Sequence, residues 1–168
     1  MKLTIDRTGK VERLFNKIIE EHFPELSVLK FVYAWRDKEK LDDEGVPVLA
    51  EVYKLSAKDR DLWGFDVRLE IDEERWTEKE KSEKRSVAYH ELLHIVLEYE
   101  EADPEKGRSK KSLKMDNEGR VCFYLTPHDV VIKRFEKEMK KYGLSDHEER
   151  VRRLLNKIHK KFEEGVEE

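Results

Sequence analysis

The stretch VAYHELLHIV, residues 87–96, decides how the rest of the chain is interpreted. It places two histidines four residues apart, with a glutamate directly after the first, among residues that are mostly apolar. In an α-helix, residues i and i+4 lie one above the other, so His90 and His94 are expected on one face. The stretch therefore predicts a helix that packs into a core and carries an imidazole pair.

This spacing is typical of a metal site. Two imidazoles one turn apart can meet at one zinc ion, about 2.0–2.1 Å from each nitrogen. Glu91, about one-quarter turn away, can then hold a water molecule without binding the metal. The alternative is a pair of hydrogen-bonded core histidines, which leaves Glu91 in need of a buried partner of its own. We therefore predict that His90 and His94 bind zinc and that Glu91 is a general base.

A catalytic zinc site needs a third protein ligand and one open position. His128 is the first candidate, because it lies in the first turn of a predicted helix, on the face that carries Val131 and Phe135. The positive end of a helix favours the neutral imidazole that a metal requires. His147 competes, since it too lies in the first turn of a predicted helix. Carboxylates are the remaining alternative, from Glu98, Glu100 or Glu118.

Three other polar residues are interpreted as structural. Asp129 directly follows His128 in the sequence and is expected to cap the same helix rather than to bind metal. His22 and His159 lie in amphipathic segments and are expected to be structural.

Outward from the motif, the hydrophobic pattern alternates between helical and strand spacing. Toward the N-terminus it predicts one helix and then three strands, over residues 8–23, 28–35, 48–56 and 65–71. The helix of the motif is predicted to begin at a capping box of Thr77 and Glu80 and to extend to Tyr99. A polar loop, a short strand and two helices follow, over residues 100–119, 120–125, 126–142 and 146–162.

This order predicts an α+β fold, with a small mixed or antiparallel sheet packed with helices. We expect a single domain over residues 1–168, with the helix at 146–162 as an appended element. The strand with Val67, Leu69 and Ile71 is expected to be an edge that pairs with an extended peptide.

Composition limits the classes of function. Charged residues make up 44% of the chain, but the net charge is only −4, which argues against a dedicated polyanion binder. Enrichment in lysine and glutamate is associated with ion-pair networks in heat-adapted proteins. The one cysteine, Cys122, permits no intrachain disulfide, and we see neither a signal peptide nor a membrane span. We therefore expect a cytoplasmic protein.

The segments RSVAYHELLHIV and LTPHDVVIKRFEKEMKKYG together resemble the phage-type metallopeptidase family, single-domain zincins of the SprT-like kind. The similarity covers about residues 28–142. It implies that His90, His94 and His128 bind one zinc ion and that Glu91 is the general base. The charged segment 100–119 and the helix after Ser145 depart from the family pattern.

The expected function is therefore zinc-dependent hydrolysis of amide bonds in a peptide or protein substrate, with Tyr89 or Tyr124 as less favoured partners for the oxyanion. One alternative is a binding module in which zinc only stabilises the fold, although such sites have no use for a glutamate at position 91. Another is a SprT-like protease that acts on DNA-associated proteins. That alternative depends on a basic cluster formed by Arg108, Lys110, Lys111 and Lys114.

Overall fold

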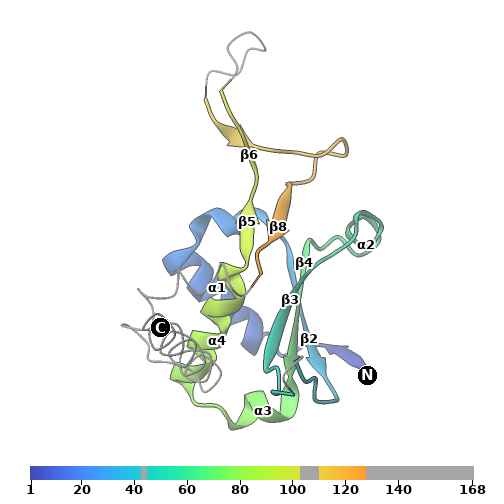
Figure 1. The fold of residues 1–168 in the computed structure, drawn as a ribbon, viewed down its shortest axis with the longest axis vertical. Helices are drawn as coiled ribbons and strands as arrows, with labels where there is room; N and C mark the ends of the chain where they lie inside the picture. The colour runs from blue at the N-terminus through green and yellow to red at the C-terminus, as the bar shows by residue number, and fades with distance from the viewer. Residues whose placement is uncertain (43–44, 103–109, 128–168) are drawn as a thin grey trace, which may run out of the picture.

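A four-stranded mixed sheet forms the centre of the protein in a computed structural model that describes residues 1–42, 45–102 and 110–127 (Figure 1). The strands lie in the order β1-β2-β4-β3. Their bounds are Leu3–Ile5 for β1, Phe31–Arg36 for β2, Ala50–Lys54 for β3 and Val67–Asp72 for β4. Strands β2 and β4 are parallel, whereas β1 and β3 run antiparallel to their neighbours. The predicted α+β class, with a small mixed sheet, is confirmed.

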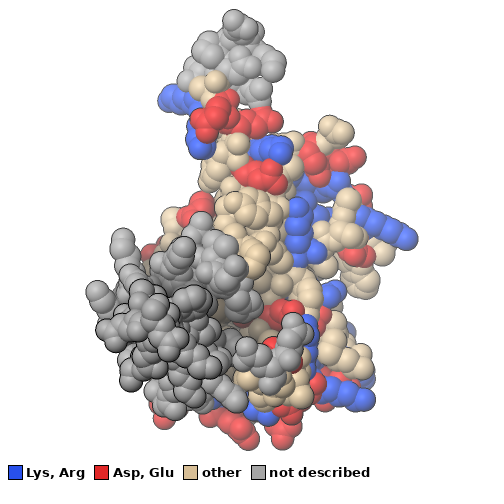
Figure 2. Space-filling view, in the orientation of Figure 1, with Lys and Arg blue, Asp and Glu red and all other residues tan. Residues whose placement is uncertain are grey.

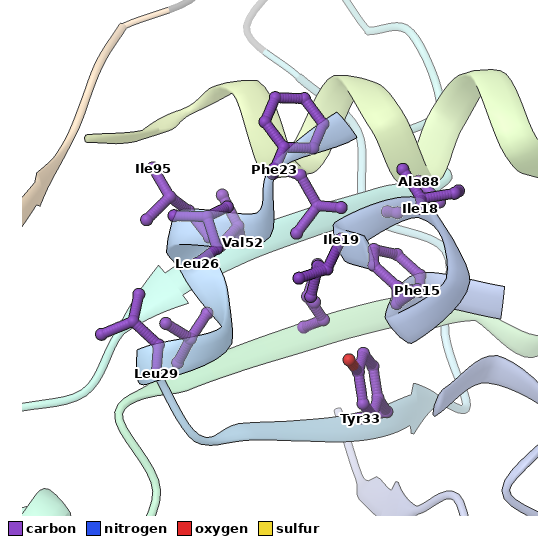
Figure 3. Packing of buried hydrophobic residues seen from close by; sticks show 14 of the residues in the cluster. Phe15, Ile18, Ile19, Phe23, Leu26, Leu29, Tyr33, Val52, Ala88 and Ile95 are labelled. Carbon is purple, nitrogen blue, oxygen red and sulfur yellow. The ribbon is translucent and has the colours of Figure 1, made fainter. Parts of the chain in front are cut away.

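Helices cover one face of this sheet. The helix α1 (Lys10–His22), the 3₁₀ helix η1 (Pro24–Val28) and the helix α4 (Lys81–Leu93) contribute to the same hydrophobic core (Figure 3). The register places Tyr33, Leu69 and Val52 side by side across β2, β4 and β3, so their side chains share the face beneath these helices. Each fully buried aliphatic or aromatic side chain contributes about 1.5–3 kcal/mol.

The opposite face of the sheet carries charged side chains. Arg36 and Glu70 are fully buried there, next to the edge-strand residue Glu51. The segment between β2 and β3 folds against them, because Arg36 donates a hydrogen bond to the carbonyl oxygen of Val48. Lys40 from the same segment forms an ion pair with Glu51. Ionic contacts therefore attach this segment to the edge strand.

The helix of the motif is shorter than the sequence predicts. The capping box consists of Glu80 and Glu83, and Thr77 instead lies inside a separate short helix, α3 (Glu73–Glu78). Its hydroxyl donates to the carbonyl oxygen of Glu73, a bond that competes with capping. The predicted start of the helix was therefore wrong by a few residues.

The predicted end of that helix, at Tyr99, was also wrong. The helix stops at Leu93, and residues Ile95–Leu97 form the strand β5, which pairs antiparallel with β8 (Phe123–Leu125). The β-branched pair at 95 and 96 favours a strand once a partner is available. Beyond it, β6 (Tyr99–Glu100) pairs with β7 (Ser112–Leu113), so part of the predicted polar loop continues the hairpin as a projecting arm (Figure 1).

The edge of the main sheet is not the strand that the sequence suggested. Strand β4 lies between β2 and β3, so its backbone groups are paired on both sides. Val67, Leu69 and Ile71 are fully buried. The edge strand on this side is β3, and the prediction that β4 pairs with a peptide was therefore wrong.

The three strands predicted before the motif and the first helix are confirmed, with shifts of a few residues at their ends. The sequence analysis missed β1 and the helix α2 (Ala57–Trp63). The helices predicted from residue 128 onward lie outside the described residues. Within the described ranges, no helix is both long and apolar enough to cross a membrane.

Candidate metal centre

The two motif histidines meet at the C-terminal end of α4. The Nε2 atoms of His90 and His94 lie 3.2 Å apart, and the ring planes are inclined by 73°. Two nitrogens bound to one tetrahedral zinc ion at about 2.05 Å would lie about 3.3 Å apart. The separation of the imidazoles therefore fits a shared zinc ion, and without an ion it also fits a hydrogen bond between the two rings.

His94 is held in the tautomer that a metal needs. Its Nδ1 lies 2.6 Å from the carbonyl oxygen of Thr126, which can only accept, so Nδ1 carries the proton and Nε2 keeps its lone pair. Burial lowers the pKa of His94, more than the Thr126 carbonyl raises it. The ring is only 4% exposed. His94 is therefore a neutral imidazole with Nε2 directed at His90.

Thr126 is attached to His94 by the backbone as well. Its amide donates to the carbonyl oxygen of His94 at 2.8 Å, and its hydroxyl donates to the same oxygen at 3.2 Å. These bonds extend the ladder between β5 and β8 by one pair beyond Ile95 and Leu125. The hairpin therefore brings the segment after β8 to the end of α4.

Glu91 is buried beside the imidazole pair, at 5% exposure. Burial is the main cause that raises the pKa of its carboxyl group to about 8, and the Glu51 carboxylate adds to the shift. The Val52 backbone amide and the Arg36 guanidinium act in the opposite direction. A carboxyl group with a pKa near neutrality can both take and return a proton.

Glu91 faces the outer edge of β3, which pairs with no further strand among the described residues. In antiparallel pairs, hydrogen-bonded and non-hydrogen-bonded residues alternate. The backbone amide of Leu55 donates to the Asp66 carbonyl oxygen, and that of Asp72 donates to the Leu49 carbonyl oxygen. Residues 49, 51, 53 and 55 are therefore the ones whose backbone groups point toward β4. The backbone groups that point away from β4 are therefore those of Ala50, Val52 and Lys54. The Val52 amide, which interacts with Glu91, is one of them.

The candidates for a third ligand divide into two groups. His128, His147 and Asp129 lie outside the described residues, as does His159. The carboxylate alternatives lie on the arm, where Glu98 pairs with Lys114 at 2.7 Å and Glu118 pairs with Arg120 at 2.8 Å. Within the described part of the chain, no group of three His, Cys, Asp or Glu side chains is arranged for a metal. In this structure Glu98 and Glu118 therefore pair with basic side chains rather than with the imidazole pair.

The remaining candidate residues have separate positions. Tyr89 packs against Phe23, with ring centroids 4.6 Å apart, and against His22 at 5.3 Å, so it belongs to an aromatic cluster. Tyr124 is exposed on β8. The sequence analysis missed Thr126 as the acceptor for His94, because it predicted a helix where β5 forms.

Two members of the proposed basic cluster on the arm pair with acidic side chains. Lys111 pairs with Glu101 at 2.9 Å, and Lys114 pairs with Glu98. Figure 2 accordingly shows positive and negative side chains mixed along the arm. Arg108 lies outside the described residues.

Comparison with known proteins adds a family. The model of the family described as "Putative phage metallopeptidase" matches residues 4–159. Neither the curated proteins nor the solved structures contain a match.

Proposed function

The chain belongs to the phage metallopeptidase family, and from that premise we propose that it is a zinc-dependent peptidase. The observation that carries the proposal is the 3.2 Å separation of the His90 and His94 Nε2 atoms next to buried Glu91. A structural zinc site is usually closed by four ligands and needs no carboxyl group beside the ion. Glu91 therefore favours a catalytic centre over a zinc that only stabilises the fold.

We assign His128 as the third ligand. The Thr126 amide donates a hydrogen bond to the His94 carbonyl oxygen, and the Thr126 carbonyl oxygen accepts one from the His94 ring. Two residues of chain span at most about 7 Å, so the backbone of His128 must start within that distance of Thr126. His147 lies 21 residues beyond Thr126, so the chain imposes no comparable restriction on it. Covalent connection thus supports His128.

In this proposal Glu91 performs the proton transfers. His90 and His94 would hold a zinc ion, which when bound would supply Lewis acidity to a water molecule and a carbonyl group. Glu91 accepts a proton from the attacking water and returns it to the leaving amine. Its burial keeps bulk water from competing for that proton.

The edge of β3 is the proposed binding site for the peptide backbone. An extended peptide can add to a free edge, with main-chain hydrogen bonds to alternate residues. The outward groups of Ala50 and Lys54 and the Val52 carbonyl offer these bonds, whereas the Val52 amide is bonded to Glu91. A peptide paired with Val52 therefore presents its carbonyl groups next to the general base.

The test is a Glu91→Gln substitution in zinc-loaded protein. We expect zinc content to be unchanged and the hydrolysis of a denatured protein substrate to fall at least about 100-fold, as for loss of a general base. Glu20→Gln, an exposed substitution on α1, is the matched control and should retain activity. Unaltered hydrolysis in Glu91→Gln would contradict the assignment.

A further inference from the structure

We propose that Lys54 closes one end of the peptide-binding groove and binds a carboxylate of the substrate there. The inference rests on the peptidase function proposed above and adds a substrate class to it. In this proposal the groove is the outer edge of β3, where Glu91 on α4 interacts with the Val52 amide.

The end of the groove is defined by the contact between β3 and β8. The Lys54 ammonium donates to the carbonyl oxygen of Phe123 and lies 4.8 Å from the centre of its ring. The backbone amide of Glu98 donates to the Cys122 carbonyl oxygen, and that of Thr126 donates to the His94 carbonyl oxygen. Because hydrogen-bonded and non-hydrogen-bonded pairs alternate along the ladder, the carbonyl group of Phe123 points away from β5. The Lys54 side chain therefore connects the outer edge of β3 with the edge of β8 that faces away from β5.

Lys54 lies close to the reacting centre. It is two residues along β3 from Val52, a distance of about 7 Å in a strand. Its backbone groups point to the same outer edge as those of Val52. A substrate residue paired beside Lys54 is thus one or two positions from the peptide bond whose hydrolysis Glu91 is proposed to catalyse.

Lys54 forms no close ion pair within the described residues, although the Glu98 carboxylate lies near enough to interact with it electrostatically. Its partners are a neutral carbonyl group and an aromatic ring, and no carboxylate of the described chain forms an ion pair with it. Nearby cations differ in this respect, since Arg60 pairs with Asp66 and Lys114 pairs with Glu98. Glu98 makes its hydrogen bond with Lys114, so it attracts Lys54 without occupying the N–H donors of that ammonium group.

The free donors of Lys54 fit a carboxylate. An ammonium group has three N–H donors, and the Phe123 carbonyl takes one of them. Charge-assisted hydrogen bonds from the others favour an anionic group over a neutral isostere. The anion is either the side chain of an acidic residue near the scissile bond or the terminal carboxylate of a peptide.

The experiment compares matched peptides with zinc-loaded protein. One set exchanges Glu for Gln at each position flanking the cleaved bond, and another set exchanges a free C-terminus for an amide. We measure kcat/KM for the wild type, Lys54→Met, Lys54→Arg and the control Lys58→Met, an exposed lysine on α2. Melting curves show whether each variant is folded.

We expect the wild type to prefer one of the acidic peptides by about five- to tenfold, the size of one charged hydrogen bond at a partly exposed site. The preference should vanish in Lys54→Met and remain in Lys54→Arg and Lys58→Met. A position-specific Glu preference identifies a side chain, and a preference for the free C-terminus identifies the terminal group. Equal rates for all pairs, or a preference that survives in Lys54→Met, would overturn the inference.

Failure of the peptidase function gives a different result. If no peptide is hydrolysed, that function is wrong, and the same peptides are then titrated against Glu91→Gln protein by fluorescence anisotropy. Tighter binding of acidic peptides, lost with Lys54→Met in that background, still supports the carboxylate site. Equal binding of the acidic and neutral peptides refutes it.

Discussion

Replacing Glu91 by Gln should alter how the stability of the metal-free protein depends on pH. Burial and Glu51 raise the pKa of Glu91 to about 8 in the folded state, against 4.5 for an ordinary glutamate. Between these pH values the unfolded chain binds fewer protons than the folded chain. The contribution of Glu91 to the free energy of unfolding is therefore complete below about pH 4.5 and is lost as pH rises toward 8. At about 1.4 kcal/mol for each pH unit, the loss reaches up to about 5 kcal/mol. Glutamine cannot ionise and should show no such loss.

The assay is urea unfolding in excess chelator at several pH values between 4.5 and 8.5. The free energy of unfolding of Glu91→Gln minus that of the wild type should rise by a few kcal/mol across this range. Taking the difference removes the contributions of the other titrating groups. Glu20→Gln, at an exposed position, should give a difference that is nearly flat. A flat difference for Glu91→Gln as well would refute the reasoning that burial governs this carboxyl group.

Three further predictions concern stability. Leu92→Ala should lower the free energy of unfolding by about 2–5 kcal/mol in urea titrations, because Leu92 is fully buried. The control Leu62→Ala, at a residue that is 71% exposed, should change it by less than about 0.5 kcal/mol. Zinc at 100 times its dissociation constant should raise the free energy of unfolding by about 2.7 kcal/mol, and dialysis against chelator followed by calorimetry should remove that gain. The abundant ion pairs predict a melting temperature above about 60 °C by circular dichroism, and a lower value would count against heat adaptation.

The sequence predicts the local chemistry of the motif better than the extent of its helix. Helical spacing alone places His90 and His94 on one face, and the structure brings their rings together. The end of the helix depends on β8, more than twenty residues later, which pairs with Ile95–Leu97. A pairing between distant segments leaves no periodic signal near the motif, and this explains the error.

The edge strand shows the same limitation. Alternation in residues 67–71 correctly predicts a strand, but not its neighbours. A central strand differs from an edge by which segments flank it, and that order is set by topology rather than by local pattern. Helix α2, in contrast, had a local signal, since Ser56 caps it and Gly64 ends it in a left-handed conformation.

The zinc content of purified protein tests the central claim most directly, when the wild type is compared with His128→Ala and His147→Ala by elemental analysis. If His90, His94 and His128 surround one ion, the wild type and His147→Ala contain one zinc per chain, and His128→Ala loses most of it. Zinc that stays in His128→Ala and disappears in His147→Ala, or a wild type that binds none from excess zinc, would contradict the account.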